Sequence, residues 1–202
     1  IRTLGGFSLG LNRQPVQDTG SRKAEALLVY LAVEGGLHNR SVLASLLWPE
    51  CPQVQAATSL RVALTVLRRH LADHLDITRE TARIKPGAHL CLDLVDLREK
   101  LASGQIEQAI EIYQGDFLQG FHLHDAAGFE DWARWEAERA RSPFLKALHA
   151  SADSAVTEGE YVRGIGYLRR LLELDPLDES AHEKCMLLLA LDGQRGAALA
   201  QY

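Results

Sequence analysis

A glycine-centred spacing recurs in the C-terminal half of the chain and constrains its fold more than any other feature. Gly159 is followed by a small residue five positions later, Gly164, and by an apolar residue nine positions later, Leu168. The same order returns 34 residues further on, at Gly193, Ala198 and Tyr202. A fixed period of this length is typical of stacked helical hairpins, in which small residues let paired helices approach closely. The spacing therefore predicts an all-α array of such hairpins.

The spacing also occurs upstream, at Gly104, Ala109 and Tyr113. The step from Gly104 to Gly159 is 55 residues, which equals one period of 34 plus an insertion of 21 around 116–136. These segments predict three tetratricopeptide-like units, of which the middle one is extended. A generic helical bundle is the alternative interpretation.

The first 93 residues have a different pattern. Strand-like segments precede Ser21, and later segments favour helices at 21–35, 40–47 and 53–72 and short strands at 77–79, 82–85 and 89–92. Pro49 and Pro52 separate the second helix from the third. The apolar residues of the third helix recur at helical spacing, at Leu60, Leu64, Leu67 and Leu71. Three helices followed by a β-ribbon predict a winged helix-turn-helix.

The expected fold class is therefore mainly α with small β elements. It consists of a winged helix-turn-helix domain at 1–93, with a short N-terminal sheet and a C-terminal wing, followed by an all-α tetratricopeptide-like array at 94–202. A long helix is expected over 129–158. Because Pro143 removes a backbone hydrogen bond and clashes with the carbonyl of Arg139, we expect a kink or break near 141–142.

The charges are divided unevenly between the two halves. The whole chain has a net charge of −5, but residues 1–90 hold eleven Lys and Arg against seven Asp and Glu, whereas residues 91–202 hold eleven against twenty. Such asymmetry suggests a nucleic-acid module joined to something else. On the predicted third helix, one line is formed by Thr58, Arg61, Thr65 and Arg68. Side chains of these types read base edges or bind phosphates in the major groove of DNA.

Further candidate contacts flank this line. Arg69 sits beside it, the predicted ribbon carries three basic residues for phosphate or minor-groove contact, and the first two helices open with basic residues where main-chain amides favour an anion. The full candidate set is Arg22, Lys23, Arg40, Thr58, Arg61, Thr65, Arg68, Arg69, Arg79, Arg83 and Lys85. A solvated charged face is the alternative interpretation of the arginines.

Other chemistry has little support in the sequence. His122, His124 and Asp125 lack a fourth ligand at a metal spacing, and the sequence has no phosphate-cradling glycine loop or catalytic-triad pattern. We therefore expect no enzyme activity, no cofactor and no metal. The longest wholly apolar run, 26–33, is far too short to span a bilayer, and three unclustered cysteines favour a reducing compartment, so a cytoplasmic protein without membrane contact is expected.

Eight segments spread over nearly the whole chain carry a family resemblance. They are LGGF at 4–7, RKAEALL at 22–28, LLWPE at 46–50, LRVAL at 60–64, LRRHL at 67–71, YQGDFL at 113–118, FEDW at 129–132, and the stretch 193–202. With these segments the chain resembles bacterial regulators of the SARP/AfsR type, which combine an OmpR-like winged helix with a bacterial transcriptional activation domain (BTAD). Two positions depart from the family pattern: Val66 stands where arginine is common, and Pro143 interrupts a helix that is usually continuous.

The resemblance implies a bacterial sequence-specific transcriptional regulator of the activator type. Its third helix would enter the major groove of double-stranded DNA, and its helical domain would support dimerisation or contact partners, with RNA polymerase as a candidate. In large relatives a nucleotide-binding switch module follows the BTAD region, and a chain that begins at Ile1 and stops within a helical pattern is expected to belong to a longer protein. The alternative is a protein-interaction scaffold whose winged helix does not bind DNA.

Overall fold

A computed structural model describes residues 1–11, 14–16 and 19–201 of the chain. Tyr202, which ends the last match to the glycine spacing, lies outside the described residues. By their contacts the residues form two compact units, one of 1–98 with 112–138 and the other of 99–111 with 139–202. The division of the sequence into a domain at 1–93 and a domain at 94–202 stays a prediction. The compact units differ from them because residues 112–138 fold with the N-terminal residues.

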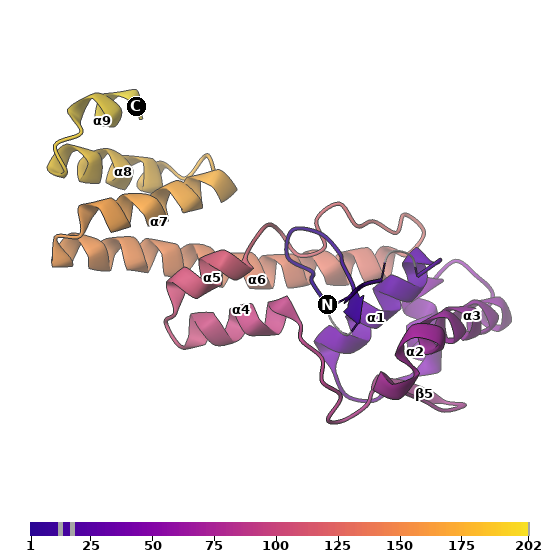
Figure 1. Cartoon of the computed structure of the whole chain (residues 1–202). Coiled ribbons are helices and arrows are strands. Elements are labelled where there is room, and N and C mark those ends of the chain that lie inside the picture. Colours follow the sequence, from indigo (N-terminus) through magenta and orange to yellow (C-terminus); the bar gives the residue numbers. More distant parts are fainter. Residues whose placement is uncertain (12–13, 17–18, 202) are drawn as a thin grey trace. The chain divides into compact units, whose positions relative to one another are not determined.

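Three helices make the centre of the first unit (Figure 1): α1 (Arg22–Glu34), α2 (Arg40–Leu47) and α3 (Gln53–Leu71). They confirm the helices expected from the sequence. The side chain of Ser21 caps α1 by accepting a hydrogen bond from the Ala24 amide, and Gly35 ends the helix at a positive φ of 61°. Asn39 precedes α2, but its side chain makes no capping hydrogen bond.

The apolar stripe of α3 faces the core of the first unit. Its buried residues are Ala56, Leu60, Ala63, Leu64, Leu67 and Leu71. They pack with α1, which buries Leu27, Leu28 and Leu31, and with α2, which buries Leu43 and Leu47. Because the stripe occupies one side of α3, the residues between these positions are turned to solvent.

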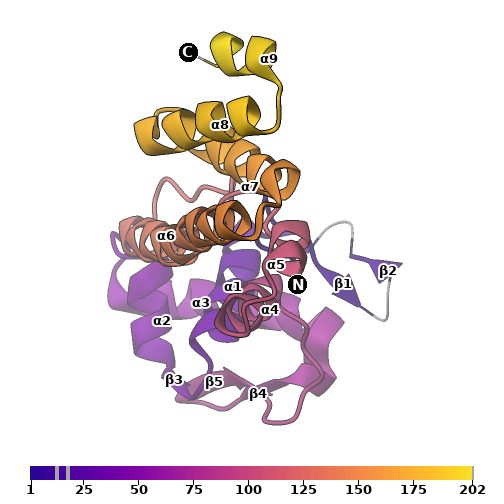
Figure 2. The same cartoon turned by 90° about the vertical axis from the view of Figure 1, so that its left-hand side faces the viewer.

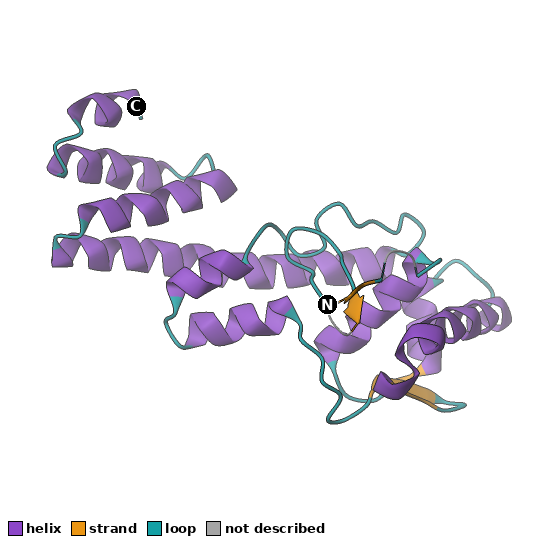
Figure 3. Ribbon diagram, in the orientation of Figure 1, coloured by secondary structure: helices purple, strands orange, loops and turns teal. Residues whose placement is uncertain are grey.

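Two small antiparallel sheets accompany these helices (Figure 3). The first pairs β1 (Gly10–Leu11) with β2 (Gln14–Pro15). In the second, a short 3₁₀ turn (Ala72–His74) leads to β4 (Leu75–Ile77), and β5 (Thr81–Ile84) lies between β4 and β3 (His38–Asn39). The β4–β5 hairpin is the predicted wing.

The third strand-like segment expected in the wing, 89–92, is not a strand. The edge of β5 that it would occupy is paired instead with β3, in the register His38↔Ala82 and Asn39↔Thr81. Two residues are too short a strand to give a pattern in the sequence, so β3 was not predicted. Its pairing attaches the start of α2 to the wing, because Arg40 follows Asn39 directly.

Main-chain hydrogen bonds join residues 112–138 to the N-terminal residues of the first unit. The amide of Gly5 donates to the carbonyl of Asp116 and the amide of Leu118 donates to the carbonyl of Thr3, at 3.1 and 2.7 Å. Phe129 is fully buried, and the indole of Trp132 donates a 2.7 Å hydrogen bond to Glu34 in α1. The insertion into the middle repeat is therefore a structural part of the N-terminal unit.

The described residues of the second unit, 99–111 and 139–201, contain helices and their connecting turns and no strand. This unit contains parts of α4 (Asp93–Ala102), α5 (Ile106–Ile112) and α6 (Ala127–Glu158), followed by α7 (Tyr161–Leu174), α8 (Glu179–Leu191) and α9 (Arg195–Ala200). Figure 2 shows α7, α8 and α9 as successive layers. The glycines of the 34-residue spacing lie at the turns between paired helices, with positive φ of 69°, 75° and 83° at Gly104, Gly159 and Gly193. The small residues of the spacing are buried, at Ala109, Gly164 and Ala198. The expected array of helical hairpins is confirmed.

Of the kink or break expected near 141–142, the break is wrong, because α6 runs without interruption through Pro143. Ala140 and Phe144, on either side of the proline, are buried, so packing holds both halves of the helix in place. Pro143 itself is exposed, where solvent can replace the missing hydrogen bond. Within the described ranges, no helix is both long enough and apolar enough to cross a membrane.

Candidate nucleic-acid interface

The solvent side of α3 carries the side chains that the sequence assigns to DNA. Each of the five candidate residues on this helix is exposed: Thr58, Arg61, Thr65, Arg68 and Arg69. From Cys51 to Ala72 the sequence contains no aspartate or glutamate, although the chain holds 27 of them. The exposed face of α3 therefore combines arginines and hydroxyl groups without a carboxylate on the same helix to neutralise them.

Two arginines connect this face to the wing. One guanidinium nitrogen of Arg68 donates a 2.9 Å hydrogen bond to the main-chain oxygen of Ile77, at the end of β4. Arg40, the first residue of α2, donates a 3.1 Å bond to the main-chain oxygen of the next residue, Thr78. These bonds orient both guanidinium groups beside the wing and leave their remaining N–H groups available to a ligand.

Positive charges converge at the point where α2, α3 and the wing meet. Partial burial of the Arg40 guanidinium, together with the nearby charges of Arg61 and Arg68, lowers the pKa of Arg40 from its ordinary value. Like charges that repel one another weaken the folded unit, and a bound anion would relieve that repulsion. The arrangement is suited to binding phosphate groups.

A hollow of about 660 Å³ lies between α2 and α3 at the same place. Arg40, Arg61 and Arg79 line it together with the hydroxyl-bearing Ser41 and Ser45. We use the term cationic face for the five arginines Arg40, Arg61, Arg68, Arg69 and Arg79. The structure thus brings candidates from three separate segments of the sequence to one side of the first unit.

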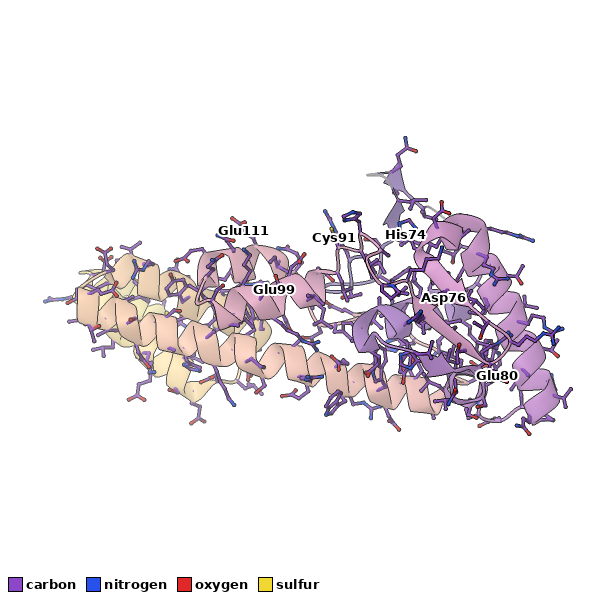
Figure 4. The ribbon with its side chains drawn as sticks, turned by 90° about the horizontal axis from the view of Figure 1, so that it is seen from below. His74, Asp76, Glu80, Cys91, Glu99 and Glu111 are labelled. Carbon is purple, nitrogen blue, oxygen red and sulfur yellow. The ribbon has the colours of Figure 1, made fainter. Side chains whose placement is uncertain are left out.

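The wing presents its basic residues in different ways. Thr78 closes the turn, since its amide donates to the carbonyl of Thr81 at 2.9 Å, and Arg79 is exposed within that turn. Arg83, by contrast, lies opposite Asp76 in the hairpin register and forms an ion pair with it at 2.9 Å. Lys85 is exposed and lies 3.4 Å from the main-chain oxygen of Ala72. Figure 4 labels the two wing carboxylates, Asp76 and Glu80.

The two basic residues that open α1 contact the loop 121–125. The guanidinium of Arg22 lies 5.1 Å from the centre of the Phe121 ring. The ammonium of Lys23 donates hydrogen bonds of 2.7 Å to Asp125 and of 2.7 Å to the main-chain oxygen of Leu47. The structure therefore places these candidates in packing and ion-pair contacts, and neither of them lines the hollow.

The net charge of the first unit shows that its positive character is local. Residues 1–98 and 112–138 together hold thirteen Lys and Arg against fifteen Asp and Glu, because the inserted segment contributes six carboxylates and one arginine. The surplus found by dividing the sequence at residue 90 does not describe this folded unit. What remains is a cationic face on a unit that is slightly acidic overall.

Sequence reasoning missed two exposed valines on α3. Val62 is 60% exposed and Val54 is 81% exposed, whereas Val66, the departure from the family pattern, is half-buried. The signal was present in the sequence, since neither exposed valine belongs to the stripe of Leu60, Leu64, Leu67 and Leu71. These valines place apolar groups among the arginines and threonines of the solvent side.

The histidines of the loop 121–125 do not gather metal ligands. His122 lies 3.3 Å from Glu130, and that carboxylate also accepts a hydrogen bond from the Leu123 amide. Over residues 1–11, 14–16 and 19–201, no group of three or more His, Cys, Asp and Glu residues is arranged to hold a metal ion.

Comparison with known proteins decides the family. The model of the family described as "Bacterial transcriptional activator domain" matches residues 92–202, which is more than half of the chain. The chain belongs to this family. The match confirms the resemblance to SARP/AfsR-type transcriptional regulators that the sequence segments suggested. Among curated proteins, none matches the chain.

The fold is also similar to that of a solved structure, "Mycobacterium tuberculosis EmbR in complex with low affinity phosphopeptide". The two share 21% sequence identity with a TM-score of 0.69, and the alignment covers 100% of this chain and 57% of the EmbR chain. The likeness supports the fold, a winged helix-turn-helix with small sheets followed by a helical array. The chain spans little more than half the length of that relative.

Proposed function

We propose that this member of the transcriptional activator family binds double-stranded DNA sequence-specifically, with α3 in the major groove. The observation that carries the proposal is the cationic face, in which arginines from α2, α3 and the wing converge beside a helix that has no carboxylate. The major groove of B-DNA is about 12 Å wide and admits one α-helix. Placing α3 there would bring Arg40 and Arg79 to the phosphates that border the groove.

The roles of the side chains follow from where they lie. Arg61, Arg68 and Arg69, on the exposed side of α3, would contact guanine edges or phosphates, and Thr58 and Thr65 would contact bases. Arg83 and Lys23 already have carboxylate partners at 2.9 and 2.7 Å, so we assign them a smaller share of the binding energy. A hydrogen bond to a new anion would compete with these ion pairs.

The remaining functional assignments are proposed together with DNA binding. The helical unit would mediate dimerisation or contact with a partner such as RNA polymerase, and a switch module could follow in a longer chain. The protein would act in the cytoplasm as a regulator rather than as an enzyme, without a cofactor or metal. The family to which residues 92–202 belong supports an activator rather than a repressor.

Charge reversal on α3 tests the proposal. The double variant Arg61→Glu/Arg68→Glu should lose salt-dependent binding to a duplex promoter fragment while keeping its circular dichroism spectrum, because both side chains are exposed and neither contributes to the core. A matched control, Arg169→Glu/Arg195→Glu, reverses two exposed arginines of the helical unit and should leave the binding nearly unchanged. A wild-type chain that shows no salt-dependent duplex binding contradicts the proposal and favours the protein-interaction scaffold.

A further inference from the structure

A valine at the centre of the solvent side of α3 is not explained by the folding of the chain. Val62 is 60% exposed, so it contributes little to the core. As a β-branched residue it is also a poorer helix former than alanine. Neither packing nor helix propensity therefore favours valine at this position, and its methyl groups are free to contact a partner.

The position of Val62 on the helix is central. At about 100° per residue, it lies roughly half a turn around α3 from Leu60 and Leu71, which are buried. The exposed residues that share its side of the helix are Gln55 and Thr58, seven and four positions before it, and Thr65 and Arg69, three and seven positions after it. If α3 enters a groove with its solvent side first, Val62 is among the residues that reach deepest.

The two threonines beside Val62 have already used their hydroxyl protons. Thr58 donates a 2.9 Å hydrogen bond to the main-chain oxygen of Val54, and Thr65 donates a 2.8 Å bond to that of Arg61. Each hydroxyl oxygen can still accept a hydrogen bond, and each side chain also has a methyl group. The three residues thus offer methyl groups and acceptors, while the hydrogen-bond donors of this side come from Gln55 and the arginines.

This combination matches one base pair better than the others. In the major groove an A·T pair shows the 5-methyl group of thymine and the N6 amino donor of adenine, whereas a G·C pair shows no methyl group. We infer that Val62 reads a thymine through its 5-methyl group, with a threonine oxygen beside it able to accept from the paired adenine. The inference rests on the proposed function, because it requires α3 in the major groove.

Replacing thymine with uracil tests the contact directly, since uracil keeps every hydrogen-bonding group and lacks only the methyl. The full chain is first used to select its preferred duplex from a random library. Each thymine of that duplex is then replaced singly by uracil. At fixed salt, one replacement should weaken wild-type binding about fourfold, the effect of one methyl group removed from an apolar contact. Val62→Ala should bind the thymine duplex more weakly and show no further loss with uracil at that position.

Val162→Ala is the matched control, because Val162 is a 68% exposed valine on α7 of the helical unit. This variant should keep the full uracil effect. If the wild type binds its selected duplex and no uracil replacement weakens that binding, the methyl contact is overturned, but the proposed DNA binding is not. An equal uracil effect in wild type and Val62→Ala overturns the assignment to Val62. Absence of any duplex binding by the wild type overturns the proposed function itself, and this inference with it.

Discussion

The ammonium of Lys23 lies 2.7 Å from a carboxylate oxygen of Asp125, at a sequence separation of 102 residues. The same ammonium bonds the main-chain oxygen of Leu47 at the end of α2 and lies 4.9 Å from the centre of the Trp48 ring. The hydrogen bond from Lys23 is the main cause that lowers the pKa of Asp125 below its ordinary value. One lysine thus holds the inserted segment and the end of α2 against the start of α1.

We expect Lys23→Ala to lower the free energy of unfolding of the first unit by about 1–2 kcal/mol, because it removes two hydrogen bonds of a charged donor whose side chain is 15% exposed. Urea unfolding monitored by tryptophan fluorescence measures this loss. Asp125→Asn should cost less, since Asp125 is 70% exposed and solvent can replace the lysine. The salt dependence of duplex binding should stay nearly unchanged in both variants. If Lys23→Ala weakens DNA binding as strongly as Arg61→Ala, Lys23 is a DNA contact after all.

The wing offers a comparison between two arginines that differ in their partners. Arg79→Ala should reduce the slope of log affinity against log salt concentration by about 0.9, the change expected when one phosphate contact is lost. Arg83→Ala should reduce the slope by less, because its guanidinium already forms a 2.9 Å ion pair with Asp76. Titration of a fluorescent duplex at several salt concentrations measures both slopes. Equal reductions would mean that DNA displaces Asp76 from Arg83.

The helices were predictable because their apolar periods and end signals are local. The stripe from Leu60 to Leu71 and the end at Gly35 each depend on residues within a few turns of one another, and both have the predicted form. The glycine spacing is local in the same sense, since each of its glycines lies at a turn between two paired helices. The candidate line on α3 follows from the same period, because residues off the apolar stripe must face solvent.

Features that depend on distant residues gave no such signal. The bridge between Leu4 and Phe117 joins residues 113 positions apart, and neither segment alone shows that they pair. The ion-pair partners of Lys23 and Arg83 could likewise not be predicted, because a sequence does not distinguish a basic residue that forms an ion pair from one that does not. The expected break at Pro143 failed for a related reason: burial of neighbouring residues outweighed the local effect of the proline.

A hydrogen bond between α7 and α5 predicts how stability depends on pH. The Tyr167 hydroxyl donates to Glu107; burial and this bond raise the pKa of Tyr167 to about 12, while the bond lowers the pKa of Glu107. The raised pKa gives stability that is present below about pH 10 and lost as pH rises towards 12. The lowered pKa of Glu107 gives stability that is present above pH 4.5, the ordinary pKa of a glutamate, and is lost as pH falls through the lower pKa of the folded state.

Tyr167→Phe removes the hydroxyl and keeps the ring, so it isolates this contribution. The variant should be less stable than the wild type by about 1 kcal/mol at neutral pH, the usual net value of such a hydrogen bond. The difference should shrink above pH 10 and below pH 4, as measured by thermal unfolding across that range. A difference that stays constant with pH would show that the loss comes from packing and not from the Tyr167–Glu107 bond.

Two glycines of α7 should respond to alanine with opposite signs. A Cβ at Gly164 would lie 2.8 Å from the Cδ1 of Leu188 and 3.3 Å from the Cβ of Ala155, so Gly164→Ala should destabilise the array by about 1–3 kcal/mol through overpacking. Gly166, two residues along the same helix, has open space where a Cβ would lie. Gly166→Ala should therefore stabilise the protein by about 1 kcal/mol, because alanine is the better helix former. Urea unfolding measures the stability of both variants. If Gly164→Ala is also stabilising, Leu188 and Ala155 can move to accommodate the methyl group. The small residue of the 34-residue spacing is then not required for the close approach of the helices.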